Sequence, residues 1–168
     1  VEKIEKISKK HNLKVVYDAA HAFDVKYKDK SVLNYGDIST ISFHSTKLFH
    51  TIEGGAIITN DDELAKVLFF FFFYGSQKKY ENEFVGLNSR LDEIQAGFLS
   101  IRLKDLDKQN QKRREVAKRY LSEIKNEKIN LPFYDGSENH VFHLFVIRTE
   151  NRENLQQYLL KNNIETLI

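Results

Sequence analysis

Residues 41–60, ISFHSTKLFHTIEGGAIITN, place a lysine between two apolar, β-branched runs. Lys47 follows Ser42 by five residues, and the pair Gly54-Gly55 comes seven and eight residues after the lysine. A lysine side chain prefers to keep its ammonium group in water. A lysine between two segments that are expected to be buried is therefore unusual and indicates a specific role. An amine that is desolvated titrates lower and can attack a carbonyl to form a Schiff base. We therefore interpret Lys47 as a candidate nucleophile.

The composition is that of a globular protein. Of the 168 residues, 41% are hydrophobic and 30% are charged. The net charge of +2 gives no electrostatic reason to expect a nucleic-acid partner. There is no cysteine, which excludes disulfides and thiolate metal sites, and we predict no metal site.

The chain carries no sign of a membrane segment or a leader. Its opening residues, VEKIEKISKKHN, lack the apolar core of a signal peptide, and the apolar run 67–74 is too short to cross a bilayer. We expect a soluble, cytoplasmic protein that does not bind membranes. The sequence starts within an amphipathic helical pattern and stops where a strand pattern begins, so we also expect a piece of a longer enzyme.

Apolar periodicity and turn residues predict an α/β protein. A serine and an aspartate at 89 and 92 are read as a capping box that starts a long helix, with Leu91, Ile94, Phe98 and Ile101 as its core-facing stripe. The predicted elements are a helix over 2–11, a strand over 13–17, a hairpin or loop over 24–37, strands over 38–43 and 56–59, a helix from 62, a long helix from 89 to about 125 with a break near Asp107, a strand over 140–149 and a helix over 152–162.

Five consecutive phenylalanines, residues 69–73, fit no single periodicity. We expect some of these rings to pack inward and others to meet a partner subunit or a neighbouring segment. A sequencing artefact would also produce such a run.

The residues around Lys47 offer the parts of a pyridoxal phosphate site. Such a site needs a lysine, a carboxylate that keeps the pyridine nitrogen protonated, and anchors for the phosphate. Asp18, at the end of a predicted strand, is the candidate carboxylate, although a turn-forming aspartate explains it equally well. His21 is a candidate for the ring hydroxyl and Ser42 for the phosphate. Taken singly, Lys47 also reads as a surface lysine and His21 as a structural histidine.

Three strings carry a resemblance to a known family: VVYDAAHAF, YGDISTISFHSTKLFHTIEGGAIITNDDELA and GLNSRLDEIQAGFL. Together with HVFHLFVIR and the terminal NNIETLI, they resemble the DegT/DnrJ/EryC1/StrS family of pyridoxal-phosphate-dependent nucleotide-sugar aminotransferases, which have the aspartate-aminotransferase fold (fold type I). The resemblance implies that residues 1–110 are the C-terminal part of a cofactor-binding large domain with a mostly parallel sheet. Residues 111–168 would be a long helix and the start of a small α+β domain.

The resemblance also implies roles for single residues. Lys47 matches the lysine that bonds the cofactor and carries protons, and Asp18 the carboxylate on the pyridinium nitrogen. Ala20 matches the small residue beneath the ring, His21 the residue near the ring hydroxyl, and Ser42 the phosphate-binding hydroxyl.

A dimer with shared active sites is implied too. Asn88 and Arg90 match a segment that reaches the neighbouring subunit's site, where the asparagine approaches the cofactor phosphate and the arginine the nucleotide diphosphate. The family's earlier large-domain portion, with a phosphate-binding helix N-terminus and an aromatic that stacks on the ring, is not in this chain. The chain alone is therefore expected not to bind the cofactor.

The implied reaction moves an amino group, commonly from glutamate, to a keto sugar on a nucleotide, for deoxyamino-sugar and surface-polysaccharide synthesis. The LFHTIEGGAI variant resembles members that act on dTDP-linked 3-keto or 4-keto deoxyhexoses. Two alternatives stay open. One is a sugar dehydratase of the same family, although those members carry histidine in place of the lysine. The other is a non-catalytic interaction module that presents the phenylalanine run and the 91–125 helix.

Overall fold

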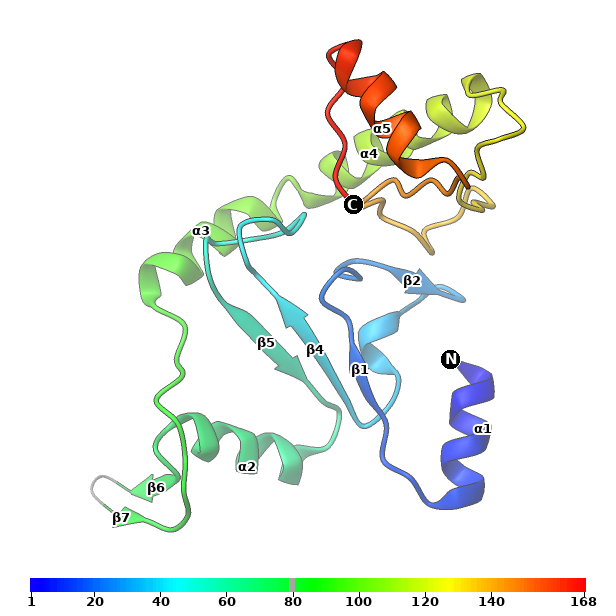
Figure 1. Cartoon of the computed structure of the whole chain (residues 1–168). Coiled ribbons are helices and arrows are strands. Elements are labelled where there is room, and N and C mark those ends of the chain that lie inside the picture. Colours follow the sequence, from blue (N-terminus) through cyan, green and yellow to red (C-terminus); the bar gives the residue numbers. More distant parts are fainter. Residues whose placement is uncertain (79–80) are drawn as a thin grey trace.

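The computed structural model describes residues 1–78 and 81–168 and shows a mixed α/β chain (Figure 1). One sheet lies at the centre, with α2 beneath it and α3, α4 and α5 above it in this view (Figure 1). The elements are α1 (Glu2–His11), β1 (Val16–Asp18), β2 (Lys26–Tyr27), β3 (Lys30–Ser31), η1 (Val32–Asn34), β4 (Ile38–Ser42), β5 (Gly55–Ile58), α2 (Asp62–Phe72), β6 (Ser76–Lys78), β7 (Glu81–Asn82), α3 (Glu93–Leu103), α4 (Leu106–Glu123) and α5 (Arg152–Lys161).

The central sheet has the strand order β1-β4-β5. β1 pairs with β4 in parallel, with Asp18 opposite Thr40, whereas β4 and β5 are antiparallel, with Ser42 opposite Gly55. Of the two pairings in this described sheet, one is thus parallel and one antiparallel, and the mostly parallel sheet expected of the large domain stays a prediction. The direction of each pairing follows from the connection between its strands. Nineteen residues, including the β2–β3 hairpin, lead from β1 to β4, but residues 43–54 turn straight back without a crossover.

The hydrophobic core lies beneath the loop that carries Lys47. Its buried side chains come from β4 and the residue after it, from the loop, from the start of α4 and from the C-terminal segment: Ile41, Phe43, Leu48, Phe49, Leu106 and Val141. Phe23 packs against this cluster and stacks on Phe49, with ring centroids 4.5 Å apart. Leu48 and Phe49 directly follow Lys47, so the core fixes one end of the lysine's loop.

The C-terminal segment differs from the predicted strand over 140–149. The described residues form only an isolated antiparallel bridge there, between Asn130 and Arg148. Val141 and Phe142 are consecutive and both buried, so the side chains do not alternate between two faces as a strand requires. Phe142 also has a positive φ of 47°, which turns the backbone out of the extended conformation.

The long helix is predicted correctly but its start is not. It consists of α3 and α4 with a break at Lys104–Asp105, close to the expected Asp107. Its N-cap is Asp92, whose backbone N–H donates to Gln95 Oε1 at 3.4 Å. Ser89 does not cap the helix, because it lies three residues before the N-cap, in a segment where its own backbone N–H donates to the Phe72 carbonyl at 3.3 Å.

The predicted core stripe of this helix is exposed on the described chain. The exposed fractions of Ile94, Phe98 and Ile101 are 75%, 53% and 64%, so no described residue buries this face. Of the four residues of the predicted stripe, only Leu91 is partly buried, and Leu99, which packs against the core, is not part of the stripe. The periodicity identified an apolar face correctly, but it carries no information about what covers that face.

The phenylalanine run forms the C-terminal end of α2 and packs partly against a neighbouring segment, as expected. Phe70, Phe71 and Phe72 are half-buried, while Phe69 and Phe73 are exposed. Residues 84–89 return alongside the run, with Leu87 N donating to Phe71 O at 2.7 Å and a bridge between Phe73 and Asn88.

Two glycines permit this close return. A Cβ on Gly75, whose φ is +71°, would lie 1.9 Å from the Phe84 carbonyl oxygen, and a Cβ on Gly86 would lie 2.0 Å from the Gly75 nitrogen. Backbone atoms cannot give way by such amounts, so the contact between the two segments requires glycine at both positions.

Candidate functional site

Two neighbouring strands bring the predicted carboxylate and hydroxyl to one edge of the sheet. Asp18 ends β1 and pairs in register with Thr40, and Ser42 ends β4 two residues later. Because β1 and β4 are parallel, their carboxyl ends share an edge, where ligands of α/β proteins commonly bind. The loop that carries Lys47 starts directly after Ser42.

The loop over residues 43–54 is closed at its base by backbone hydrogen bonds. Phe43 N donates to Gly54 O at 2.8 Å, Thr51 N to Phe43 O at 2.9 Å, and Ser45 N to Ile52 O at 2.7 Å. Ile52 has a φ of 71°, a conformation that a β-branched residue rarely adopts. The loop therefore holds a defined, strained shape around Lys47.

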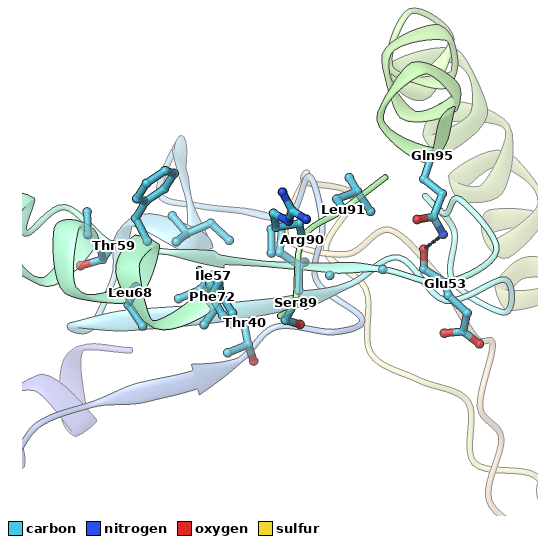
Figure 2. A pocket seen from close by; sticks show the side chains of 17 residues that line it. Thr40, Glu53, Ile57, Thr59, Leu68, Phe72, Ser89, Arg90, Leu91 and Gln95 are labelled. Carbon is cyan, nitrogen blue, oxygen red and sulfur yellow. Dashed lines mark hydrogen bonds between the residues drawn. The ribbon is translucent and has the colours of Figure 1, made fainter. Parts of the chain in front are cut away.

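α3 supports the same loop from its first turn. Gln95 Nε2 donates to the Glu53 carbonyl at 2.8 Å, the bond drawn in Figure 2, and to the Thr51 carbonyl at 3.3 Å. In return, Thr51 Oγ1 donates to the Gln95 carbonyl at 2.9 Å. These three bonds join a loop and a helix that are more than forty residues apart in the sequence.

Lys47 Nζ lies 2.7 Å from His21 Nε2. The structure thus brings together the two predicted residues that stand 26 positions apart. The His21 ring in turn meets His143 edge-on, with ring centroids 4.4 Å apart. His143 is a site residue that the sequence reasoning missed. Its only sequence signal is a histidine within the otherwise apolar run VFHLFVI.

Asp18 is available to a ligand. Its Oδ1 accepts the Ala20 backbone N–H at 3.0 Å, which leaves Oδ2 without a hydrogen bond among the described residues. No described lysine, arginine or histidine forms an ion pair with Asp18. Ser42 Oγ accepts the His44 backbone N–H at 3.3 Å, so its own hydroxyl proton is not needed for that bond. These donors and acceptors fit pyridoxal phosphate, because a free carboxylate, a hydroxyl and an amine are the groups that its nitrogen, phosphate and aldehyde require.

Burial lowers the pKa of two histidines near the lysine. The pKa of His143 falls below its ordinary value of 6.5 mainly through burial, with further lowering from the nearby His21, Lys47 and Arg113. The pKa of His50 falls for the same main reason, and Arg102 and His44 add to the effect. Both rings are therefore biased toward the neutral form, in which one nitrogen can accept a proton.

The structure does not bring Asn88 and Arg90 to this cluster. Both belong to the segment between β7 and α3, which runs along one side of the molecule in Figure 1, apart from the loop above β4. Arg90 lies against the Phe73 ring, with its guanidinium carbon 4.9 Å from the ring centre. It lines a separate hollow of about 880 Å³ between β4, β5, α2 and residues 89–95 (Figure 2).

Two further findings concern the described residues as a whole. Among them, no helix is both long enough and apolar enough to cross a membrane. No group of three or more histidines, aspartates or glutamates in the described ranges is arranged to hold a metal ion.

The mixed α/β structure matches solved aminotransferase structures over less than half of their length. It superposes with a TM-score of 0.92 on the crystal structure of S. venezuelae DesV in complex with a ketimine intermediate, at 38% identity, over 99% of this chain and 45% of that one. NtdA from Bacillus subtilis, solved with bound cofactor PMP, matches with a TM-score of 0.87 at 32% identity, over 96% of this chain and 38% of that one.

The chain belongs to the DegT/DnrJ/EryC1/StrS aminotransferase family, which matches residues 1–168. A curated relative, dTDP-3-amino-3,6-dideoxy-alpha-D-galactopyranose transaminase of Aneurinibacillus thermoaerophilus, is 51% identical over 100% of this chain and 47% of its own length. The chain thus spans about half the length of the curated relatives it matches.

Proposed function

We propose that the protein is a pyridoxal-phosphate-dependent nucleotide-sugar aminotransferase whose reactive amine is Lys47. The observation that carries this proposal is the contact between Lys47 Nζ and His21 Nε2, at the edge of the sheet where Asp18 and Ser42 end adjacent parallel strands. When bound, pyridoxal phosphate supplies an aldehyde for the amine and a ring that accepts electrons from the substrate carbon.

Each residue of the chain then has a task that its chemistry suits. The Lys47 amine holds the cofactor and moves a proton to and from the reacting carbon. The Asp18 carboxylate keeps a proton on the ring nitrogen, since a negative charge beside that nitrogen favours its charged form. His21 donates to the ring hydroxyl, Ala20 leaves room beneath the ring, and Ser42 donates its hydroxyl to the phosphate.

The experiment that tests this proposal uses the protein made from the full reading frame that encodes these residues. Pyridoxal phosphate is added, and the absorbance band of the lysine-bound cofactor is followed together with amino transfer from glutamate. We expect the band and the activity in the natural protein and the loss of both in Lys47→Ala. Asp18→Asn is expected to keep the band but to lower turnover at least tenfold, because the ring nitrogen loses its charged partner. A band of equal height in Lys47→Ala would contradict the proposal.

For the substrate, we propose a dTDP-linked 3-keto-6-deoxyhexose. Support comes from the relative at 51% identity, whose name describes a dTDP-3-amino-3,6-dideoxyhexose transaminase. The matching product is obtained when an amino group replaces the keto oxygen at that carbon, with glutamate as the donor. The test is a comparison of turnover with 3-keto and 4-keto dTDP-sugars. Faster turnover of the 4-keto sugar would contradict this choice.

Lys47 argues against the alternative function, that of a sugar dehydratase. A dehydratase of this family carries histidine in place of the lysine, whereas this chain has Lys47. Product analysis distinguishes the two reactions: an aminotransferase leaves the donor's nitrogen on the sugar, whereas the sugar product of a dehydratase has lost a hydroxyl group and carries no new nitrogen.

We further propose a homodimer in which Asn88 and Arg90 complete the neighbouring subunit's site. Their position away from Lys47 within one chain is the support for this arrangement. Lys47→Ala and Arg90→Ala proteins should each be inactive, and their mixture should regain up to about a quarter of the natural activity, because half of the dimers are mixed and each has one intact site. A mixture that stays inactive after subunit exchange would contradict shared sites.

A further inference from the structure

A second hollow is lined by His143, whose ring meets that of His21. It has a volume of about 340 Å³ and is formed by α4 and the C-terminal segment. Its lining includes two cations, a histidine and three aromatic rings: Lys112, Arg113, Tyr120, Phe142, His143 and Phe145.

His143 joins this hollow to the reactive amine. Its ring lines the hollow and also lies 4.4 Å from the His21 ring, which is in contact with Lys47. Burial lowers the pKa of His143, and the nearby His21, Lys47 and Arg113 lower it further. A molecule in the hollow would therefore contact His143, whose ring contacts His21, the neighbour of Lys47.

The charges around the hollow have one sign. No aspartate or glutamate lines it. Arg113 Nη1 donates to the Phe142 carbonyl at 3.4 Å, which fixes the guanidinium in place and leaves its other N–H groups for a ligand. The Lys112 ammonium makes no hydrogen bond or ion pair with any described residue. A fixed guanidinium and an unpaired ammonium beside aromatic rings favour a small anion, because both groups form charge-assisted hydrogen bonds with oxyanions.

We propose that this hollow is an oxyanion subsite that binds the anionic group of a substrate reacting at Lys47, through Lys112 and Arg113. The proposal rests on the proposed function. Both substrates of that reaction carry an anionic group: the amino donor has carboxylates, and the nucleotide sugar has a diphosphate. The volume suits a molecule of the size of glutamate or the diphosphate portion of a nucleotide.

The matched variants are Lys112→Glu and Lys118→Glu. Both lysines are exposed and lie on α4, but only Lys112 lines the hollow. The two variants therefore change the net charge equally and differ only in position. A third variant, Lys112→Gln, removes the charge without reversing it and is expected to have an intermediate effect. Melting curves of all three proteins check that the fold is retained.

The test is calorimetric titration of the holoenzyme from the full reading frame with two probes, glutarate and inorganic pyrophosphate. We expect Lys112→Glu to weaken the binding of one probe about tenfold or more, as the loss of a charge-assisted hydrogen bond requires, and Lys118→Glu to weaken it less than about twofold. Weakened glutarate binding identifies the donor carboxylate, and weakened pyrophosphate binding identifies the diphosphate.

The subsite proposal is overturned if Lys112→Glu weakens neither probe more than Lys118→Glu does. This result would not affect the proposed function, because the titrations measure no turnover and the Lys47→Ala experiment tests the reaction separately. The opposite outcome is also distinguishable. If the natural protein transfers no amino group, but Lys112→Glu still weakens probe binding, the anion site is supported and the proposed reaction is refuted.

Discussion

Phe49 is expected to be the residue on which the lysine's loop depends most. It follows Lys47 by two positions, is only 5% exposed, stacks on Phe23 at 4.5 Å and meets Phe43 edge-on at 5.7 Å. Truncating a buried phenylalanine to alanine typically costs about 3–5 kcal/mol, through lost transfer energy and the cavity that remains. Since a folded domain is stable by only about 5–15 kcal/mol, Phe49→Ala should remove about a fifth or more of the total.

The assay is urea unfolding of the full-length protein, followed by circular dichroism, with the free energy of unfolding taken from the midpoint and the slope. Phe69→Ala is the matched control, because Phe69 is 59% exposed on the described chain and should cost about 1 kcal/mol or less. The occupancy of Lys47 by pyridoxal phosphate should fall in Phe49→Ala and stay unchanged in the control. A loss of stability below about 1.5 kcal/mol for Phe49→Ala, or one equal to that of Phe69→Ala, would refute the idea that the core anchors this loop.

Two further predictions concern glycines and histidines. Gly75→Ala should destabilise the protein by about 2 kcal/mol or more, because the new Cβ meets the Phe84 carbonyl and φ is positive. Gly97→Ala, with nothing within 4 Å of the new Cβ in the middle of α3, should stabilise the protein by about 0.5–1 kcal/mol in the same urea unfolding experiment. Equal effects would contradict the close backbone contact. Burial is the main cause that lowers the pKa values of His50, His140 and His143 in the folded protein. Below about pH 6.5 the unfolded chain therefore binds more protons than the folded protein does. The free energy of unfolding should be highest above about pH 7 and should decrease as the pH falls through the range in which histidine titrates. His140→Gln should flatten that decline, and an unchanged slope between about pH 7.5 and 5.5 would exclude His140 as a contributor.

The sequence allowed the Lys47 cluster to be predicted because its parts are local to two strands. Asp18 and Ser42 each end a short apolar run, and the period of two in these runs is readable without a structure. Lys47 and His21 follow those strand ends by a few residues, so parallel pairing alone brings the two loops together. The antiparallel direction of β5 was missed, because strand direction depends on the path of the connecting loop and not on the strand's own residues.

The residues that were missed or misplaced depend on contacts between distant segments. His143 reaches His21 across more than a hundred positions, and no local pattern encodes such a meeting. Ser89 has the residue type of an N-cap, but its backbone N–H is used by the Phe72 carbonyl, a pairing that depends on Gly75 and Gly86. Ile94 and Phe98 form an apolar face that no described residue buries. The domain boundary at residue 110 stays a prediction.

The three-stranded sheet has a consequence for laboratory work with this chain on its own. Within the described residues, β1 and β5 are both edge strands, and each presents a row of backbone groups without a strand partner on its outer side. Unpaired strand edges readily accept a strand from another molecule, and an exposed apolar helix face adds to the attraction. The 168-residue chain is therefore expected to aggregate as its concentration rises. Expression together with the rest of the reading frame should keep it in solution.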